Sequence, residues 1–268
     1  MSALTFTLKK DLAQKLDVSP LTPDLLAGKS LAEISATLLW YGKKQIRVDE
    51  AFEITGKDTN EIVFDQSTSK IDYIGSGLKT GRITVNGDAG AFLAFQMQQG
   101  IITVHGNVND FAATEMAGGL LLINHNVGDY LGGALVGNKK GMKGGTIIVK
   151  GNAGERTGDQ MRRGIILIEG NVGNYCASRM LAGTIGVLGN VGEYVGYGMR
   201  RGTILLTQTP KLHATIQDCG IHTMPFLSLM FKSFSDFPSK FAHNNQNRVH
   251  RFAGDIGNDG KGEILVLK

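Results

Sequence analysis

The sequence has little cysteine and no long apolar run, and each shortage excludes a class of protein. Two cysteines, Cys176 and Cys219, are too few for a disulfide framework, so we expect a chain of the reducing cytoplasm. The first residues, "MSALTFTLKKDL", alternate polar and apolar side chains and lack the continuous apolar core of a secretory signal. No stretch approaches the length of a membrane span, so no membrane insertion is expected.

Charge of one sign is not in large excess either, since 28 Lys and Arg against 24 Asp and Glu leave a net charge of +4. That balance permits an acidic ligand or partner but does not require nucleic acid. The 268 residues, 42% of them hydrophobic, suit one domain or one domain with terminal additions. Glycine is in excess, at 37 residues, compared with roughly 7% of an average protein.

The glycines mark an internal repeat of nineteen residues between Gly81 and Leu206. Aliphatic side chains stand two and four residues after each leading glycine, as in "GIITV" and "GTILL", which is typical of a strand with one buried face. One step has twenty-six residues instead, and the seven additional residues fall around "LVGNKKG". The period then resumes without drift.

Three further positions of the repeat each keep one kind of side chain. Eleven residues after the glycine the side chain is aromatic, except at Arg156: Phe92, Phe111, Tyr130, Tyr175 and Tyr194. Three residues before the next glycine it is methionine: Met97, Met116, Met142, Met161, Met180 and Met199. At a turn it is asparagine: Asn107, Asn126, Asn152, Asn171 and Asn190.

A unit this short cannot bury its own apolar face, so successive units must stack and share one core. We therefore predict a mainly β fold, a right-handed parallel β-helix or solenoid of about 19-residue coils, in which equivalent residues form ladders roughly 4.8 Å apart. A leucine-rich repeat is excluded because the sequence lacks the leucine spacing of that fold. A left-handed hexapeptide helix is excluded because one of the positions at which it requires an apolar residue holds Thr114, Asp159 and Ser178. The β-helix is predicted over residues 75–207.

The two ends of the solenoid need covering, because open coils expose unpaired strand edges. We predict a small α/β cap over residues 1–74, with a capping box of Ser30 and Glu33 before a short helix and strands at "QIRVDEAFEIT" and "EIVFD". The segment "IDYIGSGLKTG" resembles an imperfect first coil. For residues 208–268 we predict a cap that packs on the solenoid and consists of a loop, an apolar helix and a final strand, "GKGEILVLK".

No catalytic residue or metal ligand is expected. Cys176 occupies a position that is small or apolar in the other copies, so packing is favoured over nucleophilic chemistry. The "GNVG" segments leave no room for the helix of a phosphate loop. Cys219 and His222, even with the other histidines nearby, match no four-ligand metal pattern. Acidic residues at the turns are expected to be solvated or to bond local backbone amides.

The basic residues carry the one functional hypothesis. Arg200 and Arg201 occupy the same positions as Arg162 and Arg163 two coils on, so the pairs should lie about 10 Å apart on one face. These basic residues either form a solvated face without a partner or bind an acidic partner or an anionic ligand. Nucleic acid is disfavoured as the partner, because the aromatic residues that would stack on its bases lie in the ladder. Arg179 has no structural role in the repeat pattern. The candidate contact residues are Lys139, Lys140, Lys143, Arg156, Arg162, Arg163, Arg179, Arg200 and Arg201.

The coil pattern G-[IT]-I-x-[VI]-x-G-N-[VA]-G…M-x-x-G resembles the C subunit of formylmethanofuran dehydrogenase and, more distantly, the β-helical C-terminal domain of the glutamate synthase large subunit. The flanks "LDVSPLTPDLLAGKSLAEI" and "GDIGNDGKGEILV" look like the bacterial form, the C subunit of the formyltransferase/hydrolase complex of methylotrophs. The C subunit of a true formylmethanofuran dehydrogenase, or a glutamate synthase-like β-helix domain protein, stays open as an alternative.

The resemblance implies a right-handed β-helix that serves as a non-catalytic scaffold beside its sister chains, the A, B and D subunits, in a cytoplasmic complex. In the one-carbon metabolism of methylotrophs, during formaldehyde oxidation, such a complex transfers the formyl group of formyl-tetrahydromethanopterin to a methanofuran analogue and hydrolyses it to formate. The D subunit transfers the formyl group and the A subunit hydrolyses it with a metal, so this chain alone would bind no cofactor. The polyglutamate tail of the methanofuran analogue is one candidate ligand of the basic residues.

Overall fold

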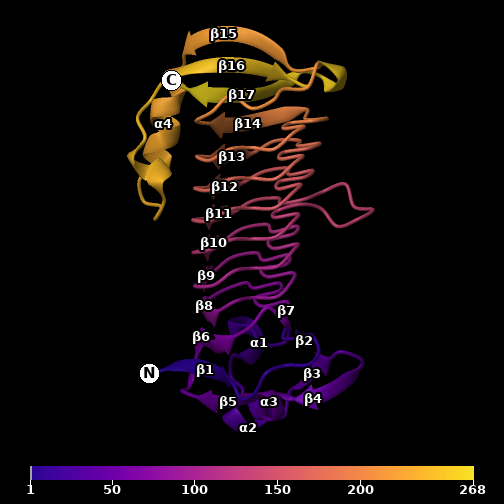
Figure 1. Cartoon of the computed structure of the whole chain (residues 1–268). Coiled ribbons are helices and arrows are strands. Elements are labelled where there is room, and N and C mark those ends of the chain that lie inside the picture. The colour runs from indigo at the N-terminus through magenta and orange to yellow at the C-terminus, as the bar shows by residue number, and fades with distance from the viewer. Residues whose placement is uncertain (1) are drawn as a thin grey trace.

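The computed structural model describes residues 2–268 and is mainly β, with large sheets and a few short helices. Most of the chain forms an elongated column of stacked repeat units (Figure 1). The main sheet has thirteen strands in the order β15-β16-β17-β14-β13-β12-β11-β10-β9-β8-β6-β1-β5. The repeat supplies β8 (Arg82–Gly87), β9 (Ile101–Val104), β10 (Leu120–Ile123), β11 (Thr146–Val149), β12 (Ile165–Ile168), β13 (Thr184–Val187) and β14 (Arg201–Leu206), and β6 (Asp58–Ser67) precedes them.

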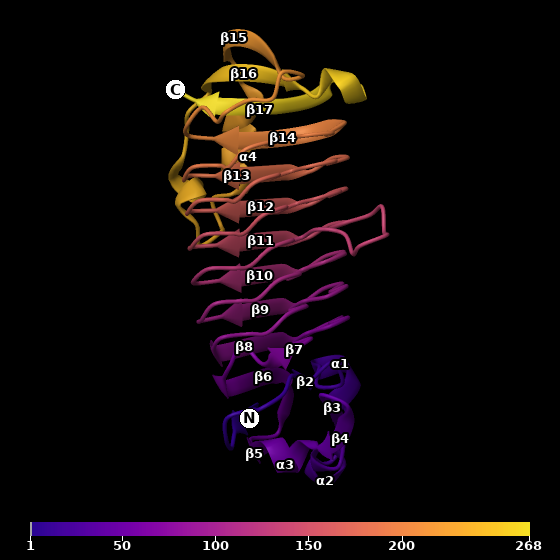
Figure 2. The same cartoon turned by 45° about the vertical axis from the view of Figure 1, so that its right-hand side comes forward.

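Neighbouring repeat strands are parallel and pair one repeat apart. Ile83 lies beside Ile102, and Ile102 lies beside Leu121. The longer step keeps the register, because Leu121 lies beside Ile147 and the additional residues project sideways as a loop (Figure 2). A second, shorter ladder of parallel bridges runs eight residues after the leading glycines. The aliphatic side chains of the two ladders therefore form one continuous core.

Each unit also contains a segment in which alternate residues have positive φ although many are not glycine. Phe92, Ala94 and Gln96 have φ values of 60°, 55° and 52°. A left-handed backbone costs an L-residue about 1–2 kcal/mol. Here hydrogen bonds to both neighbouring units hold it, since the Ala94 N–H donates to the carbonyl of Ile74 and the Gln96 N–H donates to that of Thr114. Stacking therefore imposes a conformation that the local sequence does not favour.

The turn asparagines form a hydrogen-bonded ladder along the column. Asn152 Oδ1 accepts from the Asn171 N–H at 2.8 Å, and Asn171 Oδ1 accepts from the Asn190 N–H at 2.8 Å. The corresponding contact joins Asn107 and Asn126 at 3.2 Å. Four of the five ladder asparagines, Asn107, Asn126, Asn152 and Asn171, thus satisfy a backbone donor of the next unit.

The acidic residues at the turns were expected to be solvated or to bond local backbone amides, and they are exposed or half-buried. They also make a similar ladder, in which the bonded amides belong to the next unit rather than to the same turn. Asp110 Oδ1 accepts from the Asp129 N–H at 2.9 Å, and Asp129 Oδ1 accepts from the Glu155 N–H at 2.7 Å. The physical reason is that stacking brings the next unit's amide within hydrogen-bonding reach, at the spacing of neighbouring strands.

The aromatic and methionine positions stack in separate columns. Ring centroids lie 5.1 Å apart for Phe92 and Phe111 and 4.8 Å apart for Tyr175 and Tyr194. Tyr73 extends this stack into the imperfect first unit, 4.8 Å from Phe92. The methionines are fully buried: Met97, Met116, Met142, Met161, Met180 and Met199.

The N-terminal residues cover one end of the column. The capping box of Ser30 and Glu33 is confirmed at the start of α2 (Leu31–Ser35). The strand predicted at "QIRVDEAFEIT" is wrong in its middle, because a helical turn, α3 (Val48–Ala51), with two acidic residues at its N-terminus, separates two strands there. The other elements of this end are β1 (Ala3–Leu8), β2 (Leu16–Asp17), α1 (Pro23–Leu26), β3 (Leu38–Tyr41), β4 (Lys44–Arg47), β5 (Phe52–Thr55) and β7 (Ile71–Asp72).

The C-terminal end is covered by strands. The final strand predicted there is confirmed as β17 (Lys261–Leu267), which pairs in parallel with β14. β16 (Arg248–Gly254) and β15 (Gln217–Thr223), which the sequence pattern does not predict, continue the sheet antiparallel.

The apolar helix predicted in this segment is present, but its predicted position over the end of the column is wrong. The helix α4 (Phe226–Ser233) lies along the side of the column (Figures 1 and 2), and its Leu227 and Phe231 belong to a cluster with the outward-facing Leu167 and Leu205. The backbone groups at the edge of β14, the last repeat strand, are paired by β17, and β16 in turn pairs with β17. The helix is therefore not needed at that edge and covers an apolar face of the sheet instead. Two short 3-10 helices complete the segment, at Lys240–His243 and Ile256–Asn258. No helix within residues 2–268 has the length and apolar character needed to cross a bilayer.

The asparagine ladder gives a first prediction. Asn171→Ala should lower the free energy of unfolding by about 1 kcal/mol, because the Asn190 N–H loses its acceptor. Asn171→Asp keeps an acceptor oxygen at the same place and should cost clearly less. Urea unfolding followed by circular dichroism measures both, and equal losses would contradict a role for this hydrogen bond.

Candidate functional site

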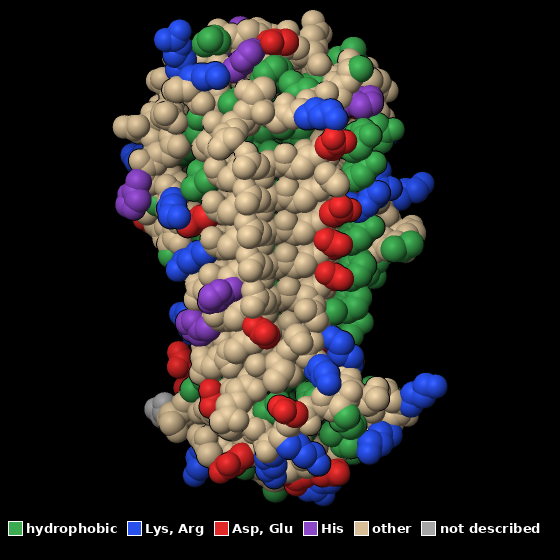
Figure 3. Space-filling view, viewed as in Figure 1, with side chains coloured by type: hydrophobic (Ala, Val, Ile, Leu, Met, Phe, Trp, Pro, Cys, Tyr) green, Lys and Arg blue, Asp and Glu red, His purple; other side chains and the backbone are tan. Residues whose placement is uncertain are grey.

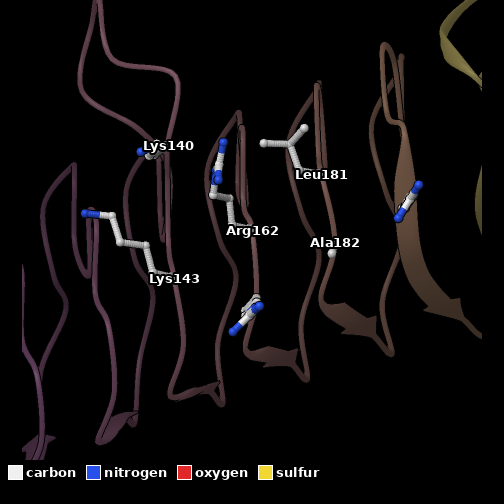
Figure 4. Close-up of a pocket in the computed structure, with 7 residues that line it drawn as sticks. Lys140, Lys143, Arg162, Leu181 and Ala182 are labelled. Atoms are coloured by element: carbon white, nitrogen blue, oxygen red, sulfur yellow. The ribbon is translucent and has the colours of Figure 1, made fainter.

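A groove of about 740 Å³ crosses successive units on one side of the column. Basic residues line it: Lys140, Lys143, Arg162, Arg163 and Arg201, which we call the basic groove. Figure 4 shows Lys140 and Lys143 beside Arg162, with the smaller Leu181 and Ala182 on the next unit. The repeat places residues of the same position side by side in successive units. The groove is built by units with basic residues at the positions just after the methionine, and the unit with the smaller Leu181 and Ala182 lies between them.

Most of these charges have no ionic partner. Among residues 2–268, no carboxylate lies within 4.0 Å of Lys140, Arg162, Arg163 or Arg201. The groove is therefore electropositive and suited to an anion.

Lys143 differs from its neighbours, because its Nζ lies 3.3 Å from Oε2 of Glu115, a carboxylate whose side chain is 8% exposed. Burial raises the pKa of Glu115, but hydrogen bonds from Asn138 and Lys143 outweigh it and hold that pKa below its ordinary value. The Lys143 charge is thus partly neutralised within the chain.

A second groove, of about 330 Å³, shares Arg162 with the basic groove and is lined also by Lys139, Arg179 and Arg200. Arg201 lines the basic groove, whereas the adjacent Arg200 lines the second groove. The predicted basic face is thus divided into two connected grooves.

Arg179, which the repeat pattern leaves without a role, has a partner in the chain. Its Nε donates to Asp159 Oδ1 at 3.0 Å, and the hydroxyl of Ser178 donates to the same carboxylate oxygen. Asp159 is 1% exposed, whereas the Arg179 side chain is 53% exposed. The hydrogen bond to Asp159 raises the pKa of Arg179 above its ordinary value. This arginine is therefore held in one orientation at the surface.

Arg156 takes the place of an aromatic residue in the aromatic column. Its guanidinium carbon lies 4.6 Å from the ring centre of Tyr175 and 5.9 Å from that of Tyr130. These cation–π contacts hold the half-buried charge between two rings. Arg156 is consequently a fixed cation of the ladder.

An aromatic groove of about 420 Å³, which no sequence pattern predicts, lies beside these arginines and is lined in part by Tyr194, Tyr197 and His213. Tyr197 is 44% exposed and lies edge-on to His213, with ring centroids 5.4 Å apart. His213 follows the last repeat, so no periodic signal could have placed it here. The one available signal was Tyr197, a large aromatic residue at a position that is polar in the two preceding units, at Asp159 and Ser178.

The charged groups are unevenly distributed around the column. Figure 3 shows a largely uncharged face bordered by a row of acidic side chains, with Lys and Arg side chains beside the projecting loop.

The remaining candidates from the sequence do not form a site. Cys176 is fully buried, which raises the pKa of its thiol to about 12. His222 Nε2 lies 2.8 Å from the carbonyl oxygen of Cys219, and His250 pairs with Asp218 at 2.6 Å. Over the described range 2–268, no group of three or more His, Cys, Asp or Glu is arranged to hold a metal ion.

The burial of Cys176 predicts selective thiol chemistry. At pH 8.5 iodoacetamide should label the partly exposed Cys219 but not Cys176, because a pKa of about 12 leaves Cys176 as the protonated thiol at every pH well below that value. Both should react in denaturant. Peptide mass spectrometry, with Cys219→Ala as the control, measures this, and labelling of Cys176 in the folded protein would refute it.

The chain matches one known family over most of its length. Residues 43–224 match the family model described as the GXGXG motif. The segment Gly196–Gly198 carries two such alternating glycines, both with positive φ, in the left-handed part of the unit. The stacked repeat with this left-handed segment is the class of protein that the structure defines.

Several relatives are C subunits. The C subunit of the molybdenum-containing formylmethanofuran dehydrogenase 1 of Methanothermobacter marburgensis is 41% identical over 84 residues, 31% of this chain and 21% of that protein. The C subunit of the formyltransferase/hydrolase complex Fhc of Methylorubrum extorquens is 36% identical over 86 residues, 32% of each chain. These alignments thus span less than two thirds of the curated relatives.

A solved structure matches the whole chain. A chain in the crystal structure of the formyltransferase/hydrolase complex FhcABCD from Methylorubrum extorquens, in complex with methylofuran, has 34% sequence identity and a TM-score of 0.91. The match covers 98% of this chain and 99% of that one. This chain therefore belongs to the GXGXG-motif family that includes the C subunits of formylmethanofuran dehydrogenases and of the formyltransferase/hydrolase complex, which confirms the resemblance found in its repeat.

Proposed function

We propose that this chain is the scaffold protein, the C subunit, of a formyltransferase/hydrolase complex. The observation that carries this is the match over 98% of the chain to a structure of that complex, at a TM-score of 0.91 and 34% identity. Its sister chains would be the A, B and D subunits. The complex would act in cytoplasmic one-carbon oxidation, transferring the formyl group of formyl-tetrahydromethanopterin to a methanofuran analogue and hydrolysing it to formate.

The scaffold assignment is supported by how the chain uses its polar side chains. Asparagines and turn acids bond the backbone of neighbouring units, and the buried carboxylate Asp159 is paired with Ser178 and Arg179. We propose that the chemistry belongs to the sister subunits, with the metal in one of them, and that this chain alone binds neither methanofuran nor tetrahydromethanopterin.

We also propose that the stacked units are the coils of a right-handed parallel β-helix over residues 75–207, capped by residues 1–74 and 208–268. The in-register parallel ladders one repeat apart support a helical path of the chain. The right hand rests on the resemblance and on the general preference of parallel crossovers.

The basic groove is the part of this surface best suited to an anionic component of the complex. Arg162, Arg163 and Arg201 have no carboxylate within 4.0 Å in residues 2–268. A polyglutamate tail on the methanofuran analogue would meet these charges in succession, because the repeat spaces them along the column. An acidic surface of a sister subunit is the other partner of matching charge.

Assembly is the direct test of the proposed function. When the tagged chain is co-expressed with the A, B and D chains of its organism, we expect all four to co-purify in fixed stoichiometry, measured by native mass spectrometry. The purified complex should release formate from formyl-tetrahydromethanopterin when the methanofuran analogue is added, and the chain alone should not. Failure of the four chains to associate would refute the proposal.

Charge reversal tests the basic groove separately. Changing Arg162, Arg163 and Arg201 together to glutamate should weaken assembly or lower turnover at least tenfold at low salt, since the groove then repels an anion. The same three changed to glutamine should have a smaller effect. Unchanged assembly and unchanged turnover in the glutamate variant would exclude both anionic partners.

The local identity of 41% to the C subunit of a molybdenum-containing formylmethanofuran dehydrogenase favours one alternative, the C subunit of a true dehydrogenase complex. Metal analysis of the native complex distinguishes the two, because molybdenum or tungsten in stoichiometric amount is expected only for the dehydrogenase.

A further inference from the structure

The insertion loop, Leu135–Gly141, is the seven-residue segment that lengthens one repeat unit from nineteen to twenty-six residues. It projects from the column between β10 and β11 (Figures 1 and 2). Val136 is 89% exposed, the highest value among the large apolar side chains of residues 2–268 that are exposed. An apolar side chain held out in water contributes nothing to the core of this chain.

The base of the insertion loop is fixed to the units on both sides. The side-chain amide of Asn138 donates to the Glu115 carboxylate, and Gln160 Nε2 donates to the backbone carbonyl of Asn138 at 2.9 Å. Lys143, just after the loop, pairs with the same carboxylate. Val136 is therefore presented from an anchored base.

A groove of about 660 Å³ lies between the insertion loop and the arginines of the next units, and we call it the loop groove. Its apolar lining is Ala134, Leu135 and Val136, at the start of the loop. Its basic lining is Lys139, on the loop itself, and Arg156, Arg179 and Arg200 of the following units.

The loop groove carries an excess of positive charge on pre-organised side chains. The one acidic residue that lines it is Asp159, which is 1% exposed and already paired with Arg179. Arg179 is held by that carboxylate and Arg156 by two aromatic rings, so binding would restrict few side-chain rotamers. Acidic groups flanking an apolar side chain would match both the charge and the apolar edge.

We propose that the loop groove is the docking site of an acidic segment of a sister subunit, with Val136 buried at that interface. The inference rests on the proposed place of this chain in a heteromeric complex. A protein segment fits better than a purely anionic ligand, because Leu135 and Val136 gain only from an apolar partner. The apolar residues that line the basic groove, Leu181 and Ala182, are half-buried rather than exposed.

Site-specific cross-linking tests the occupant. The photoreactive residue p-benzoylphenylalanine in place of Val136, in the intact co-expressed complex, should cross-link to a peptide of the A, B or D chain that is rich in Asp and Glu. The same residue in place of Leu229, which is 73% exposed on α4, is the control for random contact. A cross-link to a second copy of this chain, to a peptide without acidic residues, or to nothing would overturn the proposal.

Deleting residues 135–141 tests the loop itself, because the deletion restores the nineteen-residue period. The shortened chain should keep its melting temperature within a few degrees and lose at least tenfold in affinity for the co-expressed sister subunits. If the deletion unfolds the chain, Arg200→Glu decides, with Lys57→Glu on the N-terminal cap as the matched charge control. Arg200→Glu should weaken assembly at least tenfold at low salt and Lys57→Glu should not.

The outcomes separate the two proposals. If the unchanged chain does not assemble with the A, B and D chains, the proposed function fails. If it assembles and the folded deletion variant or Arg200→Glu assembles equally well, only the loop groove is excluded.

Discussion

The structure depends on one constraint: each repeat unit finds its backbone hydrogen-bond partners in the units on either side. Strands nineteen or twenty-six residues apart pair in parallel, and the turns are bridged by asparagine and aspartate side chains that accept from the next unit's amides. A unit this short has no core of its own. Stability is therefore shared along the column, and any residue that breaks the stacking is felt by two neighbours.

The same constraint accounts for the left-handed backbone conformation within each unit. Residues such as Phe92 and Gln96 keep positive φ although glycine would adopt it more easily. Hydrogen bonds to the previous and the next unit fix these residues, and the aromatic rings at one of the positions then stack about one strand spacing apart. Glycine is required only where an added Cβ would meet the backbone, as at Gly106, where it would lie 2.3 Å from the carbonyl oxygen of Gly87.

The side chains available to partners are those at the positions that vary between units. The aliphatic, methionine and asparagine side chains contact neighbouring units within the stack, so they are not available. Arginine fills several of these on one side of the column, and the insertion loop projects there as well. A rigid column with localised cationic grooves fits the scaffold function that we propose.

The period of nineteen, read from the leading glycines and aliphatic pairs, was enough to predict a mainly β chain of stacked units, because every unit obeys the same local rule. The family was predicted from the resemblance of the coil motif and of the two flanking segments to known C subunits. The seven-residue step gave the position of the insertion loop, and the spacing of Arg162 and Arg200 placed them near one another. Only the tertiary structure decided that Asp159 orients Arg179, that Arg200 and Arg201 face different grooves, and that α4 covers a side of the column. These depend on contacts between non-repeating residues of different units, for which the sequence contains no periodic signal.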